Sequence, residues 1–149
     1  MQTTGTVSEI LQNKTPALWR VAPTATVFDA IREMADRNIG ALLVMDGDRL
    51  CGVISERDYT RKVALRGKSS RETQVREILS TPLVAATPDS TVEECMRLMT
   101  EHRVRHLPVL HSGKVIGIVS IGDLVNWIIS AQSLAISQLE NYISGQYPG

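Results

Sequence analysis

Hydrophobic and polar positions recur along this chain at a fixed spacing. When the sequence is shifted against itself by 65 residues, positions 20–59 align with positions 85–124 without a gap, and ten of the forty pairs are identical. Most other pairs keep their apolar or polar character, and a shorter match joins Val7–Leu11 to Val75–Leu79 at a shift of 68 residues. Repetition of this kind indicates two copies of one structural unit in tandem.

The residue pattern of each copy predicts a helix, two strands and a second helix. Thr26 and Thr91 precede apolar positions that recur every three or four residues, as N-caps of amphipathic helices do. Two short apolar runs follow in each copy, separated by Asp-Gly in the first copy and by Ser-Gly in the second. Short runs flanked by such turn residues are typical of the strands of a hairpin. A serine after the second run begins the next helix.

One unit of about 50–60 residues buries too little surface to be stable alone, whereas two units packed through their sheets share a core. We therefore expect an α+β fold of two tandem βαββα units, sheet to sheet, with pseudo-twofold symmetry and helices outside. The expected boundaries are a single module over 1–149, with repeats at 6–66 and 74–130 and a helical extension at 131–149. The apolar face of this long C-terminal helix packs either on the module itself or on another subunit.

Composition narrows the function further. The chain has 149 residues, 43% of them hydrophobic, and its sixteen basic residues balance sixteen acidic ones. A net charge of zero gives no overall attraction to nucleic acid or to an anionic membrane. Neither a signal-peptide pattern nor a membrane-spanning apolar run is present, so we expect a cytoplasmic protein. No nucleophile motif is visible, so we expect no catalytic residues and no enzyme.

The pattern Ser-x-x-Asp occurs twice, each time where a predicted strand ends and a helix begins. The two pairs are Ser55 with Asp58 and Ser120 with Asp123. A serine at the N-cap with an acid three residues later is a capping box, which is a purely structural role. A carboxylate at this place can also accept hydrogen bonds from both hydroxyls of a ribose, while the helix N-terminus faces a phosphate. Both roles can coexist.

A cluster of cations lies between the helix and the strand of the second copy. Arg103, Arg105 and His106 supply positive charge and fork-shaped donors that suit phosphate, and Arg57 adds another cation. The uncharged counterparts in the first copy are Asn38, Gly40 and Ala41. A solvated basic turn is the simpler interpretation, but a turn with only a structural role does not require this asymmetry. A zinc site at His102 and His106 is disfavoured because neighbouring cations repel a metal ion.

Three segments together resemble the CBS domain: Gly-Val-Ile-Ser-Glu-Arg-Asp (52–58), Gly-Ile-Val-Ser-Ile-Gly-Asp (117–123) and Arg-His-Leu-Pro-Val (105–109). The two copies are similar to a CBS pair, or Bateman module, of the stand-alone type, and the resemblance covers about residues 6–128. It implies a regulatory module that binds AMP, ADP, ATP, NAD or S-adenosylmethionine between the copies and acts on a partner protein. It also implies an antiparallel homodimer.

The resemblance further implies how ligand-binding residues are shared between two sites. In what we call the first site, Val53, Ser55 and Asp58 hold the adenosine, and Arg57, Arg103, Arg105 and His106 hold the phosphates. In what we call the second site, Ile118, Ser120 and Asp123 face Asn38, Gly40 and Ala41, without phosphate-binding cations. The alternative is a ligand-free structural or oligomerisation module that acts through the C-terminal helix.

Overall fold

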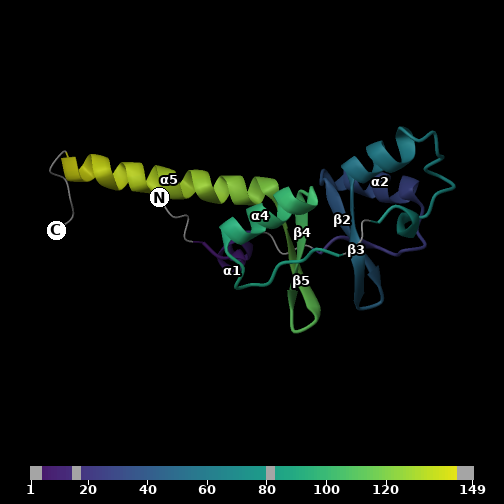
Figure 1. The fold of residues 1–149 in the computed structure, drawn as a ribbon, viewed down its shortest axis with the longest axis horizontal. Coiled ribbons are helices and arrows are strands. Elements are labelled where there is room, and N and C mark those ends of the chain that lie inside the picture. The colour runs from purple at the N-terminus through teal and green to yellow at the C-terminus, as the bar shows by residue number, and fades with distance from the viewer. Residues whose placement is uncertain (1–4, 15–17, 80–82, 144–149) are drawn as a thin grey trace.

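The computed structural model describes residues 5–14, 18–79 and 83–143 (Figure 1). The first copy comprises β1 (Arg20–Val21), α2 (Val27–Arg37), β2 (Ala41–Asp46), β3 (Arg49–Ser55) and α3 (Glu56–Tyr59), which runs into the π-helical turn η1 (Thr60–Ala64). Its sheet has the order β1-β2-β3, with β1 parallel to β2 and β2 antiparallel to β3.

The second copy has the same plan except for its first strand. It comprises α4 (Val92–His102), the hairpin of β4 (His106–His111) and β5 (Lys114–Ser120), and α5 (Ile121–Ile143). In place of a first strand, a single parallel bridge joins Ala86 to Val109. Strand β3 of the first copy contacts both β4 and β5, so the two hairpins meet at the centre of the molecule. The predicted α+β fold of two βαββα units with a long C-terminal helix is confirmed.

Local chemistry explains where these elements begin and turn. The side chains of Thr26 and Thr91 each accept a hydrogen bond from the backbone N–H three residues later, as predicted for N-caps. Helices α2 and α4 both end at a left-handed residue, Asn38 with φ 54° and Arg103 with φ 53°. These aligned positions therefore share a backbone geometry and differ only in charge.

The segments that precede the two copies are exchanged in space. Helix α1 (Val7–Gln12) packs on the second copy, where the N–H of Val7 donates to the carbonyl of Ser90. The segment before the second copy, which includes the 3₁₀ turn η2 (Val75–Glu77), packs on the first, and the N–H of Val75 donates to the carbonyl of Ala25. The core of the second copy is therefore completed by the segment that precedes the first copy in the sequence. The core of the first copy is completed by the segment that precedes the second.

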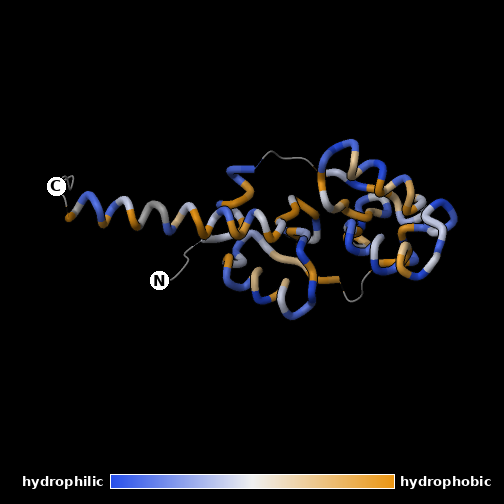
Figure 2. Tube along the Cα trace, turned by 90° about the horizontal axis from the view of Figure 1, so that it is seen from above, coloured by the Kyte–Doolittle hydropathy of each residue, from blue (hydrophilic) through white to orange (hydrophobic). Residues whose placement is uncertain are grey.

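Helix α5 extends well beyond the body of the protein (Figures 1 and 2). Near its start, Leu124 is fully buried and Trp127 and Ile128 pack against the core of the second copy. Farther along, apolar positions recur on an exposed surface of the helix (Figure 2). Within the described part of the chain, no helix combines the length and apolar character needed to cross a membrane.

Candidate functional site

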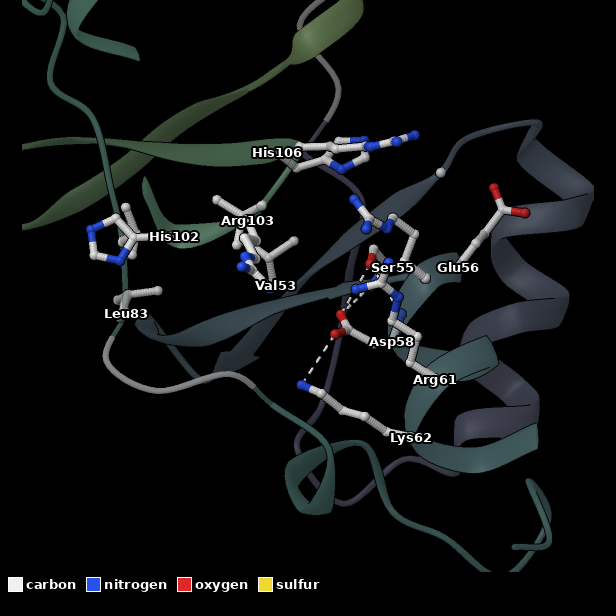
Figure 3. Close-up of a pocket in the computed structure, with 15 residues that line it drawn as sticks. Val53, Ser55, Glu56, Asp58, Arg61, Lys62, Leu83, His102, Arg103 and His106 are labelled. Atoms are coloured by element: carbon white, nitrogen blue, oxygen red, sulfur yellow. Dashed lines mark hydrogen bonds and ion pairs between the residues drawn. The ribbon is translucent and has the colours of Figure 1, made fainter. Parts of the chain in front are cut away.

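A cavity of about 320 Å³ lies between the two copies (Figure 3). The end of β3, α3 and η1 form one wall, and residues 83–84 and 102–106 of the second copy form the other. The structure brings eight of the residues predicted for the two sites to this cavity: Gly40, Val53, Ser55, Arg57, Asp58, Arg103, Arg105 and His106. The first site is therefore a single space shared by both copies.

Asp58 is held in this cavity by its own helix start. Its Oδ2 accepts from the backbone N–H of Ser55 at 2.9 Å and lies 3.1 Å from the Ser55 hydroxyl, while the Asp58 N–H donates to that hydroxyl at 3.3 Å. The predicted capping box is thus present. Its other oxygen, Oδ1, lies 3.2 Å from Nζ of Lys62 (Figure 3). The cap fixes the carboxylate direction and leaves one oxygen oriented toward the cavity wall.

Cations from both copies surround this carboxylate. Arg57, Arg61 and Lys62 come from α3 and η1, and Arg103 and Arg105 come from the turn between α4 and β4. The charge of Arg61, followed by burial and the charge of Arg105, lowers the pKa of Arg57. Guanidinium groups keep their proton in proteins, so the cluster holds like charges close together. An anion bound among them relieves this repulsion.

His106 lies where the two sites adjoin. Burial, followed by the charge of Lys14, lowers the pKa of His106, while the carboxylates of Asp123 and Asp58 act in the opposite direction. The imidazole is therefore neutral at pH 7 and can both donate and accept. A Cβ atom at Gly40 would stand 3.4 Å from Oε1 of Glu56 and 3.6 Å from Cε1 and Nε2 of this ring, so the backbone of Gly40 lies directly beside the imidazole.

The second site contains a lysine side chain that the sequence analysis did not place there. Oδ2 of Asp123 accepts from the Ser120 N–H at 2.8 Å and from Nζ of Lys14 at 2.7 Å, and Lys14 also donates to the carbonyl of Ile118 at 2.8 Å. Burial raises the pKa of Asp123, but the bonds and charge of Lys14 together with Ser120 outweigh it, so the net pKa is lowered. Sequence reasoning did not identify Lys14.

The three uncharged residues predicted for the second site do not line one space together. Gly40 lines the first site, and Ala41 is a buried core residue of β2. Asn38 lines a smaller hollow of about 230 Å³ beside α2, together with Gly40 and Glu56. The alignment that paired these positions with Arg103, Arg105 and His106 correctly matches the backbone, but the matched residues do not have equivalent environments.

Sequence reasoning also missed part of the first site. Arg61 and Lys62 lie three and four residues after Asp58, a helical spacing that places all three on one face. The sequence patterns discussed above assign neither of them to a site. The remaining lining residues that were not predicted are Glu56, Leu83, Val84, His102 and Val104. In the described part of the chain, no three His, Cys, Asp or Glu side chains are grouped to hold a metal ion.

Comparisons with known proteins agree with this architecture. The CBS domain family model matches residues 7–65 and 75–130. A CBS domain-containing protein of Arabidopsis thaliana, CBSX3, named as mitochondrial, is 37% identical over 152 residues, covering 95% of this chain and 73% of its own.

Solved structures extend the comparison. A signal-transduction protein with CBS domains from Burkholderia ambifaria has a TM-score of 0.82 at 49% identity, with 86% of this chain and 96% of its own covered. A CBS domain protein from Pyrobaculum aerophilum, complexed with AMP, has a TM-score of 0.69 at 28% identity, with 80% and 89% covered. Two repeats that each match the family model, in a fold shared with these structures, show that this chain belongs to the CBS domain family.

Proposed function

We propose that this protein is a regulatory module that binds an adenosine nucleotide in the first site. The observation that carries the proposal is a cavity of about 320 Å³ in which a capped carboxylate, Asp58, faces arginines from both copies. A carboxylate suits the two hydroxyls of a ribose, and arginine forks suit phosphate oxygens. The AMP complex of the Pyrobaculum relative supports this class of ligand. AMP, ADP, ATP and NAD(H) all carry the required groups.

The ligand acts in this proposal by connecting the two copies. Asp58 belongs to the first copy, whereas Arg103 and Arg105 belong to the second. A nucleotide that contacts all three favours one relative placement of the copies, because its affinity differs between placements. The outcome is a shift of population that a partner protein can detect, without a chemical step.

Calorimetric titration with AMP, ATP, NAD and NADH tests the proposal. At least one of them should bind, and Asp58→Ala should weaken that binding by roughly 10- to 100-fold, because charged hydrogen bonds to the ligand are lost. Asp58→Asn keeps an oxygen for the Ser55 N–H and so separates loss of the cap from loss of charge. Asp48→Ala, at an exposed carboxylate of the β2–β3 turn, is the matched control and should bind as the wild type does.

Two results contradict the proposal. One is the absence of binding by all four nucleotides to the folded wild-type protein. The other is binding that Asp58→Ala and Asp58→Asn leave unchanged, because the ribose carboxylate is the group from which the assignment starts.

A second function, self-association through α5, is favoured by a separate observation. Among the described side chains of α5, five large apolar ones are 40% to 75% exposed. They occupy a and d positions of a heptad repeat in which Gln132 holds the remaining d position: Val125 (d), Ile129 (a), Ile136 (a), Leu139 (d) and Ile143 (a). β-Branched residues at a are typical of parallel two-stranded coiled coils.

The charges of α5 allow such a pairing. Between Leu124 and Ile143, Glu140 is the sole charged residue in the sequence, so an in-register pair brings together few like charges. We therefore propose that α5 pairs with α5 of a second copy. This association is compatible with nucleotide binding, because the first site lies at the other end of the second copy from the free end of α5 (Figure 1).

A further inference from the structure

The ammonium group of Lys14 lies in the second site although this residue is distant in sequence from its partners. Lys14 follows α1, and its Nζ bridges the carboxylate of Asp123 at 2.7 Å and the carbonyl of Ile118 at 2.8 Å. The side chains of the ion pair are partly buried, with 34% of Lys14 and 23% of Asp123 exposed. Hydrogen bonds with a charged group are stronger than neutral ones, and partial burial reduces screening by solvent.

These two acceptors are the counterparts of groups that line the first site. Asp123 aligns with Asp58, and Ile118 aligns with Val53. The carbonyl of Ile118 points away from β4, because Ile118 and Pro108 form a non-hydrogen-bonded pair of the hairpin, and the Pro108 carbonyl accepts from the N–H of Ala86 instead. A single lysine therefore takes both the carboxylate and the backbone acceptor that an adenosine would use in the second site.

The first site also contains a lysine, but its bonds are arranged differently. Lys62 approaches Asp58 at 3.2 Å from one turn farther along the same helical segment. It also donates a hydrogen bond to the backbone carbonyl of Ile78 at 2.8 Å. Val53 and Asp58 both line the cavity of about 320 Å³ in this arrangement. In the second site, a lysine thus bonds to both Asp123 and the carbonyl of Ile118. In the first site, a lysine bonds to Asp58 and to the carbonyl of Ile78.

The electrostatics around His106 support the same placement of Lys14. The charge of Lys14 contributes to the lowered pKa of His106, a residue that also lines the first site. The ammonium therefore lies close enough to this imidazole for its charge to act on it. A ribose that binds Asp123 must displace the ammonium from Asp123 and from the carbonyl of Ile118.

We infer that Lys14 is a built-in occupant of the second site and restricts the protein to one nucleotide per chain, bound at Asp58. The inference rests on the proposed function, because it specifies which of the two equivalent sites the nucleotide uses. It assigns to Lys14 a role in site selection. Removal of the ammonium should open the second site without altering the first.

Calorimetric stoichiometry with AMP and with ATP tests this role. The wild type should bind one nucleotide per chain, and Lys14→Met, which keeps the apolar stem without the charge, should bind two. Lys114→Met is the matched control, since this exposed lysine lies at the far end of β5, and it should bind one. Asp58→Ala should weaken the single wild-type event by roughly 10- to 100-fold, whereas Asp58→Ala combined with Lys14→Met should show an event at the second site that Asp58→Ala does not weaken.

The possible outcomes separate the inference from the proposed function. Two nucleotides per wild-type chain, or one per Lys14→Met chain that remains folded, overturn the role of Lys14 and leave nucleotide binding established. Failure of the wild type and of Lys14→Met to bind either nucleotide overturns the proposed function itself. If Lys14→Met does not fold, the wild-type stoichiometry and the weaker binding of Asp58→Ala still decide between one site and two.

Discussion

At the scale of single residues, His106 connects the two halves of the protein more directly than any sequence pattern indicates. It lines the first site, yet the charges that act on it come from both sites: Lys14 and Asp123 on one side, Arg105 and Asp58 on the other. A change in occupancy at either site therefore changes the protonation of one imidazole. This makes His106 a natural reporter of the state of the protein.

We predict that His106 titrates below the ordinary value of 6.5 and that Lys14→Met moves its pKa upward, because the neighbouring positive charge is removed. Imidazole NMR signals followed between pH 4.5 and about 8 measure the shift, and His106→Asn assigns them. Since the folded state binds this proton less readily than the unfolded state, stability falls as pH decreases through 6.5. A His106 pKa that Lys14→Met leaves unchanged contradicts the placement of Lys14.

The sequence was sufficient to predict those residues of the first site whose partners lie close to them along the chain. Ser55 and Asp58 are three residues apart, and a capping box can be recognised from that spacing alone. Lys14 could not be found in this way, because 109 residues separate it from Asp123 and only the tertiary fold brings them together. The roles of all these residues in binding stay predictions until a ligand is measured.

At the scale of elements, α5 carries an apolar stripe made of Val125, Ile129, Ile136, Leu139 and Ile143. An exposed stripe of this kind is expected of a helix that pairs with a second chain, and not of one that packs only on its own chain. We predict that Ile136→Asp weakens self-association by roughly 100-fold or more, because pairing then buries two unpaired carboxylates. Light scattering coupled to size-exclusion chromatography over a range of concentrations measures the effect. Ser137→Asp adds the same charge at an exposed neighbouring position off the stripe and should associate as the wild type does.

Association unaffected by Ile136→Asp would show that another surface holds the copies together. Nucleotide affinity should be unchanged in this variant, since residue 136 is far from the first site along α5. The point substitution is preferable to removal of the helix, because Trp127 and Ile128 pack against the core of the second copy.

The helices and hairpins were predictable because each carries its own periodicity and its own turn. The first strand of the second copy was not, because its pairing is reduced to one bridge at Ala86. Tertiary contacts, not local propensity, decide whether so short a segment forms a strand. The partner of α5 was left open by its sequence pattern, and the structure shows that the start of the helix packs on the chain while its later turns are exposed.

At the scale of the whole molecule, the exchanged segments couple the two cores. Val7 is fully buried in the core of the second copy, and Val75 is fully buried in the core of the first. Neither position can be assigned to its core from the repeat alone, since the two segments align with each other in sequence.

We predict that Val7→Ala and Val75→Ala each lower the free energy of unfolding by roughly 1–3 kcal/mol, through lost burial and the cavity left behind. Hydrogen exchange should become faster in the copy on which the altered segment packs, and not in the copy that this segment precedes in the sequence. Val7→Ala should speed exchange mainly in β4 and β5, and Val75→Ala mainly in β2 and β3. The two variants serve as controls for each other, and faster exchange in the copy adjacent in sequence would contradict the exchange of segments.

The exchange also has a consequence for the order in which the chain can fold during translation. Helix α1 leaves the ribosome early, but the backbone of residues 88–92, which it pairs with, follows some eighty residues later. At about 5–20 residues per second, this is a delay of several seconds. The first core, in contrast, can close once residues 73–79 have been synthesised, because all of its members lie between Val21 and Leu79. The first copy can therefore fold before the second, whereas α1 must remain undocked until most of the second copy has been synthesised.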